Sequence, residues 1–269
     1  MGANRWGKSE IRVSKLYRGE DGDDISDVTV QVLVEGDVEA AHLHGDNSAV
    51  LPTDTMRNTV YALAQDHLTK DLEAFGVTVV DHFLARSDVH LATVRLSERV
   101  WQRATATGFV GGNAERREAR VVRGRGETGT WAGIDGLVLL KTTGSGFSGF
   151  PRDEFTTLAE TEDRILSTSV TTEWRYQTVP SDTTSAWAEV REAVVGAFFD
   201  KRSASVQHQG WMMAEAALDA VPEIAVIRFR LPNQHHLRFD LTPFEMIDQR
   251  IVFQPVSEPY GDIGFTVSR

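Results

Sequence analysis

The order of strand-like and helix-like segments, which occurs twice along the chain, constrains the fold more than any other feature. A half-buried strand alternates apolar and polar side chains, whereas an amphipathic helix repeats its apolar side chains every three to four residues. In the first half these patterns predict strands at 11–16 and 27–36, helices at 55–65 and 72–85, and strands at 90–101 and 117–123. The first half therefore reads strand-strand, helix-helix, strand-strand.

The second half of the chain repeats this order. We predict strands at 130–142 and 171–178, helices at 185–200 and 205–221, strands at 224–231 and 236–241, and short terminal strands at 251–253 and 263–267. Residues 231–234 are predicted to form a tight turn, and Pro222 is expected to end the second helix. The sequence thus predicts an α+β fold of two tandem domains, 1–134 and 135–269. Each is an antiparallel four-stranded sheet with two helices on one face.

Composition excludes several classes of function. The 269 residues suit two domains, and the longest apolar run, near 136–140, predicts a buried strand and is too short to span a membrane. The absence of cysteine excludes disulfides, thiolate metal sites and cysteine nucleophiles, and it is compatible with a reducing cytoplasm. A net charge of −11 argues against nucleic-acid binding, so an anionic substrate needs a local Arg or Lys.

Histidine pairs raise the question of a metal site. His42 and His44 could share one face of a strand and contact one ion, whereas His235 and His236 would point to opposite faces of a strand. No cluster of carboxylates and histidines with good ligand spacing accompanies either pair. The sequence therefore predicts no metal.

Several segments, taken together, resemble the urate oxidase family. They occur in the family's order along nearly the whole chain: Trp6-Gly7-Lys8, Pro52 to Thr55 with Asn58-Thr59, Thr143 to Phe150, Pro151 to Leu158, Asp163 to Thr168, Ser205-Val206-Gln207 and Leu231 to His236. The resemblance implies two tandem tunnelling-fold domains per subunit. It also implies a homotetramer with active sites at subunit interfaces, and oxidation of urate by O2 and water to 5-hydroxyisourate and hydrogen peroxide without a cofactor. The terminus 265–269 lacks a peroxisomal Ser-Lys-Leu, so a bacterial cytoplasmic enzyme is expected.

The resemblance also implies which residues bind the substrate. Arg164 and Gln207 match the pair that grips the purine edge, which suits a forked guanidinium and a planar amide. Phe147 matches the ring that stacks on the purine, and the backbone of Val206 matches a position that hydrogen-bonds it. Asp54 matches a backbone contact to the purine that, with Thr53 and Lys8, comes from the neighbouring subunit.

Catalysis without a cofactor requires proton removal and placement of oxygen. Lys8 and Thr53 match the family's catalytic dyad, in which the lysine accepts a proton through the threonine hydroxyl. His235 matches the histidine that extends this relay, and histidine titrates closest to neutral pH of all side chains. Asn233 matches the amide that holds oxygen above the ring, so the resemblance implies that Asn233 also binds substrate.

Each of these residues also has an ordinary structural explanation. Arg164, in a helical segment after several acidic residues, could form a surface ion pair, and Phe147 could be a core or loop plug. Gln207 and Lys8 could simply be solvated, and Thr53 or Asp54 could cap a helix. Two other functions stay open: a pterin-metabolising tunnelling-fold enzyme, which would need zinc ligands, and a non-catalytic purine-binding module, which would not need Lys8, Thr53 and His235.

Overall fold

The computed structural model describes residues 2, 4–111, 114–247 and 249–269, and its chain divides into two compact units. Unit 1 comprises 1–134, 173–187 and 223–225, and unit 2 comprises 135–172, 188–222 and 226–269. The main strands follow the order β1-β2-β3-β6-β7-β8-β9-β10, and four of the pairings, β1–β2, β2–β3, β3–β6 and β9–β10, are antiparallel. This confirms the predicted α+β class with an antiparallel sheet.

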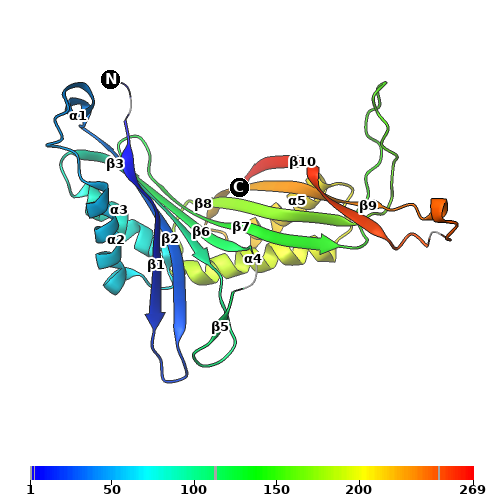
Figure 1. Ribbon diagram of the computed structural model, residues 1–269, viewed down its shortest axis with the longest axis horizontal. Helices are drawn as coiled ribbons and strands as arrows, with labels where there is room; N and C mark the ends of the chain where they lie inside the picture. The colour runs from blue at the N-terminus through cyan, green and yellow to red at the C-terminus, as the bar shows by residue number, and fades with distance from the viewer. Residues whose placement is uncertain (1, 3, 112–113, 248) are drawn as a thin grey trace. The chain divides into compact units, whose positions relative to one another are not determined.

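Unit 1 holds the first strand and helix set (Figure 1). Its elements are β1 (Trp6–Tyr17), β2 (Asp24–Gly36), α1 (Glu39–His44), α2 (Thr53–His67), α3 (Leu72–Leu84), β3 (Val89–Arg99), β4 (Gln102–Arg103), β5 (Phe109–Val110) and β6 (Arg116–Gly124). Helices α2 and α3 cover one face of the strands. The valines of β2 at 28, 30, 32 and 34 alternate toward these helices, and all four are fully buried.

Unit 2 holds most of the second set. Its elements are β7 (Gly129–Lys141), β8 (Leu166–Tyr176), α4 (Thr183–Asp200), α5 (Val206–Ala220), β9 (Ile224–Arg238), the 3-10 turn η1 (Thr242–Phe244) and β10 (Phe253–Ser268), of which the parts 129–134, 173–176, 183–187 and 224–225 belong to unit 1. The two predicted helices of each half are confirmed, with ends shifted by one or two residues.

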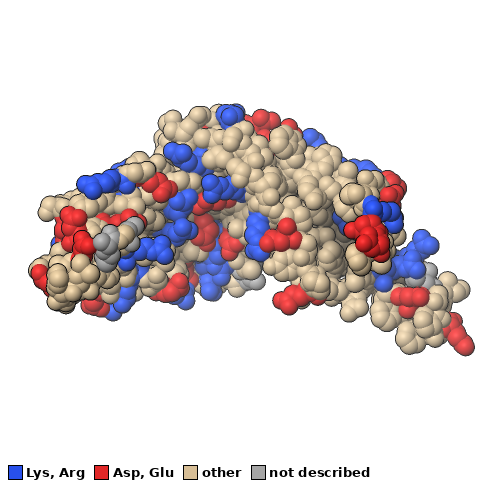
Figure 2. Space-filling model, turned by 90° about the horizontal axis from the view of Figure 1, so that it is seen from above, with Lys and Arg blue, Asp and Glu red and all other residues tan. Residues whose placement is uncertain are grey.

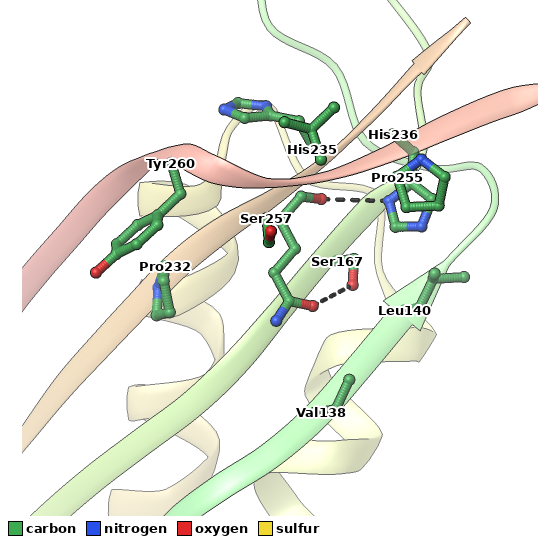
Figure 3. Close-up of a pocket in the computed structure, with 11 residues that line it drawn as sticks. Val138, Leu140, Ser167, Pro232, His235, His236, Pro255, Ser257 and Tyr260 are labelled. Carbon is green, nitrogen blue, oxygen red and sulfur yellow. Dashed lines mark hydrogen bonds between the residues drawn. The ribbon is translucent and has the colours of Figure 1, made fainter. Parts of the chain in front are cut away.

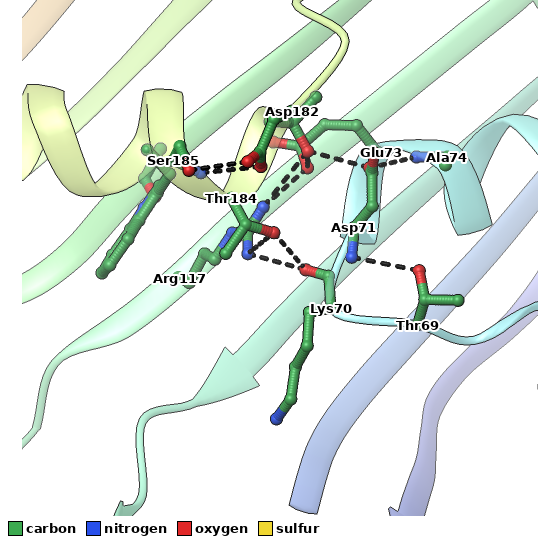
Figure 4. Close-up of polar contacts among 12 residues, drawn as sticks. Thr69, Lys70, Asp71, Glu73, Ala74, Arg117, Asp182, Thr184 and Ser185 are labelled. Carbon is green, nitrogen blue, oxygen red and sulfur yellow. Dashed lines mark hydrogen bonds and ion pairs between the residues drawn. The ribbon is translucent and has the colours of Figure 1, made fainter. Parts of the chain in front are cut away.

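A buried network of polar side chains lies at the start of α3 in unit 1 (Figure 4). Arg117 donates to a carboxylate oxygen of Glu73 at 2.9 Å, and the Thr183 hydroxyl donates to the same carboxylate at 2.7 Å. Arg117 also donates to the Lys70 carbonyl at 2.9 Å. Because Glu73 and Arg117 are both almost fully buried, this network joins α3, β6 and the first turn of α4. Burial raises the pKa of the Glu73 carboxyl, and the Arg117 guanidinium opposes that shift.

Two predictions about the end of the chain are wrong. Residues 231–234 do not turn, because β9 runs unbroken from Ile224 to Arg238. The two short terminal strands are one strand, β10, from Phe253 to Ser268. Pro232 is tolerated inside β9 because the β9–β10 register shifts between Val256 and Gly261, and a proline without an N–H fits beside such an irregularity.

Two further predictions need correction. Residues 136–140 do not form a fully buried strand, because Val138 is 57% exposed and Leu140 is 41% exposed on the opposite face from Leu137 and Leu139. His42 and His44 lie in helix α1 and not in a strand, so side chains two residues apart do not share a face. The segment 104–117, to which the sequence pattern assigns no role, includes β5 of the β4–β5 hairpin, and its residues 112 and 113 lie outside the described chain.

Candidate active site

Phe147 and Arg164 are brought together in unit 2 by a lattice of backbone hydrogen bonds. The Phe147 and Thr161 peptides exchange bonds of 2.7 and 3.0 Å, and the Arg164 N–H donates to the Ser145 carbonyl at 2.8 Å. The Ser203 peptide, just before α5, donates to Gly144 at 2.9 Å and accepts from Gly146 at 2.8 Å. The loop at 143–147 is thus fixed both to the segment before β8 and to the entry of α5.

Arg164 is a half-buried cation without an anionic partner. It lies in an extended segment before β8 and not in a helix, which corrects the prediction made from its acidic neighbours. Asp163 instead accepts from the Thr143 hydroxyl and the Gly144 N–H, and Glu162 pairs with Arg202 at 3.2 Å. Among the residues that the structure describes, no carboxylate lies within ion-pair distance of Arg164, and its Nε is buried without an acceptor.

Several other arginines of the chain lie beside carboxylates. Basic and acidic groups lie close together on the face shown in Figure 2. The ion pairs of the chain include Arg123–Asp81 and Arg230–Asp262. Burial lowers the pKa of the Arg164 guanidinium, but a guanidinium stays charged at neutral pH. Arg164 therefore offers a desolvated positive charge to an anion from outside the chain.

Phe147 supplies an aromatic surface next to that charge. The Arg164 guanidinium carbon lies 5.2 Å from the centre of the Phe147 ring, which is half-buried and not a core plug. Phe150 stacks on the same ring with centroids 4.9 Å apart and planes inclined by 16°. A flat, electron-rich anion could therefore meet a cation and an aromatic surface in one place.

The first turn of α5 presents Val206 and Gln207. Ser205 caps this helix, since its side chain accepts from the His208 N–H at 3.0 Å. The Val206 side chain is 4% exposed and packs into the core, whereas the Gln207 side chain is exposed and has no hydrogen-bond partner in the described chain. Gln207 thus offers a free amide donor and acceptor at the helix start.

Asn233 and His235 lie on one side of β9, and His235 is one of the residues that line a cavity of about 670 Å³ (Figure 3). Asn233 Nδ2 and His235 Nδ1 are 3.5 Å apart. His236 Nδ1 instead lies 3.3 Å from the Gln234 carbonyl, and the two imidazoles point away from each other. The cavity opens on the helix-free face of the unit 2 strands, where Val138 and Leu140 are exposed.

Lys8, Thr53 and Asp54 belong to unit 1. Lys8 lies on β1 where the register with β2 shifts, and the Trp6 indole donates to the Leu51 carbonyl at 3.1 Å, which ties the start of β1 to the chain before α2. Thr53 is the first residue of α2 and Asp54 the second, so neither is the N-cap, a position that Pro52 occupies without a side-chain cap bond. Asp54 pairs with Arg57 at 2.8 Å.

Neither the Lys8 ammonium nor the Thr53 hydroxyl has a hydrogen-bond or ion-pair partner in the described part of the chain, and the two do not bond to each other. The structure therefore groups the predicted residues by unit. Phe147, Arg164, Val206, Gln207, Asn233 and His235 are in unit 2, and Lys8, Thr53 and Asp54 are in unit 1.

Sequence reasoning missed a buried, hydrogen-bonded lysine at the end of β7, just before the loop that contains Phe147. The buried Lys141 donates to the Gln209 side chain at 2.6 Å and to the Lys201 carbonyl at 2.9 Å. The one available signal was a lysine at an inward position of the apolar alternation of β7, where Leu137 and Leu139 are also buried. No group of three or more residues that could hold a metal ion occurs among the described histidines and carboxylates.

Comparisons with known proteins agree on one family. A family model described as uricase matches residues 4–127 and 130–264. The uricase of Arthrobacter globiformis is 39% identical over 272 residues, covering 100% of this chain and 90% of that protein. The uricase of Dictyostelium discoideum is 36% identical over 276 residues, covering 99% and 96%.

Solved structures give the same result. The crystal structure of the Arthrobacter globiformis uricase superposes with a TM-score of 0.95 at 39% identity, covering 100% of this chain and 94% of that one. A urate oxidase structure from Bacillus sp. TB-90 shares the fold with a TM-score of 0.85 at 22% identity, covering 99% of each chain. This chain belongs to the uricase family.

Proposed function

We propose that the protein oxidises urate with O2 and water to 5-hydroxyisourate and hydrogen peroxide, with no metal or organic cofactor. The observation that carries the proposal is Arg164, a half-buried guanidinium without a carboxylate partner, held against the Phe147 ring. Urate at neutral pH is a planar monoanion, so it can replace the missing counter-ion and stack at the same time. The balance is one urate, one O2 and one water for one 5-hydroxyisourate and one H2O2.

Binding follows from the chemistry of three side chains. The forked guanidinium of Arg164 can donate two parallel hydrogen bonds to a carbonyl oxygen and an adjacent ring nitrogen. The free amide of Gln207 can donate and accept on the far edge of the ring, and the Val206 N–H adds a backbone donor at the start of α5. Phe147 covers one face of the ring, which excludes water from that face.

The protein then has to remove a proton and place oxygen. Lys8 and Thr53 would take a proton from bound urate, and His235 would extend the relay. The resulting dianion would donate electrons to O2. Asn233, beside His235 on β9, would hold O2 and then the attacking water above the ring. The Asp54 backbone would contact the purine beside Thr53.

We further propose that Lys8, Thr53 and Asp54 act on urate bound by a neighbouring subunit in a homotetramer. The residues 1–134 and 135–269 would form two tandem domains, in keeping with the two segments that the family model matches. The Lys8 ammonium and the Thr53 hydroxyl support the shared site, because neither has a partner in the described chain and both are available to a ligand. In the described chain no helix is long and apolar enough to cross a membrane. We propose the cytoplasm as the location, which fractionation of source cells would test.

Oxygen uptake tests the proposed reaction. Purified protein, treated with chelator and free of flavin, should consume O2 with urate but not with xanthine, and should release one H2O2 for each O2. Folded protein that leaves urate untouched, or activity that returns only with added metal or flavin, would contradict the proposal.

Subunit mixing tests the shared site. Lys8→Met and Arg164→Met proteins should each be impaired, but co-assembly should create wild-type sites where an intact Lys8 meets an intact Arg164 from the neighbour. Random mixing would restore about a quarter of the sites. No recovery in confirmed mixed tetramers would place both residues in the same subunit's site.

A further inference from the structure

Lys141, outside the residues discussed for binding and catalysis, is a buried ammonium that contacts only neutral groups. It ends β7 in unit 2 and is 8% exposed. Its Nζ donates to Gln209 Oε1 at 2.6 Å and to the Lys201 carbonyl at 2.9 Å, and it lies 5.4 Å from the centre of the Phe198 ring. No carboxylate in the described chain pairs with it, and burial lowers the pKa of the ammonium.

These contacts join three elements. Gln209, 1% exposed, lies in the first turns of α5, and its Nε2 donates to the Ala197 carbonyl in α4 at 2.9 Å. Lys201 directly follows α4. Lys141 therefore holds the end of β7, the end of α4 and the start of α5 at a fixed spacing. A methionine would fill similar space without the cost of burying a charge. What the ammonium adds is a hydrogen-bond donor for two carbonyl oxygens that would otherwise lack one.

The same three elements carry the substrate-binding groups. The loop with Phe147 begins directly after Lys141, and Gln207 lies two residues before Gln209 on α5. Lys201 lies two residues before Ser203, whose peptide bonds to Gly144 and Gly146 in that loop. A shift at the ammonium would therefore move the carboxamide of Gln207 relative to the ring of Phe147.

We propose that Lys141 is a positioning residue for substrate binding, which acts through Gln209 and Lys201 to hold Gln207 at the correct distance from Phe147 and Arg164. This inference rests on the proposed function, because the bound ligand is taken to be urate. Lys141 makes no contact with the substrate in this scheme. Its loss should therefore weaken binding and leave the chemical step largely intact.

The test compares Lys141→Met, Gln209→Met and the double variant. The Kd of urate is measured by equilibrium dialysis without O2, and KM and kcat are measured with O2. A misplaced contact can lower activity up to about a hundredfold. We expect each single variant to raise the Kd and KM of urate about tenfold, with kcat within about twofold of wild type. Because both side chains act through one contact, the double variant should be no worse than either single variant.

Val79→Ala is the matched control, since Val79 is a fully buried residue of α3 in unit 1. It should lower the melting temperature without raising the Kd of urate. An equal rise in Kd in Val79→Ala would make the effect one of general destabilisation and overturn the proposal. So would an unchanged Kd in Lys141→Met, or a fall in kcat at constant Kd. Gln209→Met answers the same question if Lys141→Met does not fold.

Amide hydrogen exchange gives a readout that needs no activity. Loss of Lys141 should speed exchange at 142–147 and 203–209 and leave α2 and α3 unchanged. Unchanged exchange at both segments would overturn the positioning role even if the enzyme oxidises urate. A different result would separate the two proposals. If the wild-type protein binds no urate but Lys141→Met still speeds exchange at both segments, the proposed function is refuted and the structural role of Lys141 stands.

Discussion

Replacing Arg164 by methionine separates substrate binding from folding. Charge-assisted hydrogen bonds from a guanidinium contribute about 1.5–3 kcal/mol, so their loss should raise KM for urate about tenfold to a hundredfold. The substitution should affect folding little, because the removal of Arg164 leaves no carboxylate without a partner and its buried Nε has no acceptor to lose. Methionine also removes the cost of desolvating a cation. We therefore expect the melting temperature to change by less than about 3 °C.

The assay follows the loss of urate absorbance over a range of urate concentrations, together with thermal unfolding of the same samples. Arg123→Met is the matched control, because Arg123 forms an exposed pair with Asp81 at 2.7 Å and should leave KM unchanged. The reasoning about Arg164 is wrong if its variant keeps the wild-type KM with a lower kcat. It is also wrong if the activity falls only in proportion to the folded protein.

Three other predictions follow from the same contacts. Lys8→Met should lower kcat by more than about a hundredfold while KM changes little, as measured by O2 uptake at saturating urate. Arg117→Met leaves the buried Glu73 carboxylate without its ion-pair partner and should lower the free energy of unfolding, measured in urea, by about 3–5 kcal/mol. Combining Glu73→Gln with Arg117→Met should recover part of that loss. Hydrogen bonds from Thr143 and Gly144 lower the pKa of the Asp163 carboxyl, so its contribution to stability is present above the unfolded pKa of about 3.9 and is lost as pH falls through the lower folded pKa. The melting-temperature gap between wild type and Asp163→Asn should accordingly be constant above about pH 5 and shrink below about pH 4, and a gap that widens on acidification would contradict this.

Sequence periodicity predicted the strands and helices well wherever one face of an element is apolar and the other polar. The valines of β2 show this, because they alternate with the half-buried positions Thr29, Gln31 and Leu33, two of which are polar. The pattern was misleading in β7, where Val138 and Leu140 face outward although they are apolar. Alternation cannot reveal which face is buried when both faces carry apolar residues. The exposed face of β7 borders the cavity that contains His235. The apolar residues Val138 and Leu140, which were predicted to be buried, therefore line this cavity and not the core.

Pro232 shows a second limit of local reasoning. A proline followed by asparagine usually indicates a turn, and that prediction ignored the partner strand. The break in register between Val256 and Gly261 is a tertiary feature, and it lets β9 continue through Pro232. As a result Asn233 and His235 lie on one face of a single strand, 3.5 Å apart, and not on either side of a turn. The misassigned turn therefore hid the alternation that places Asn233 beside His235, which lines the cavity.

The polar groups left without partners are more informative about the site than any motif taken alone. Lys8 is half-buried like Arg164, but the ammonium at the end of a long lysine stem readily reaches water, so its lack of a partner says little by itself. Arg164 is different, since a half-buried guanidinium normally finds an anion within the chain, and here the adjacent Asp163 and Glu162 are engaged by Thr143 and Arg202. The local fold thus keeps the nearest carboxylates away from Arg164, and the charge stays available to an incoming anion. The ordinary alternative for Arg164, an ion pair with those same acidic neighbours, does not occur in the described chain.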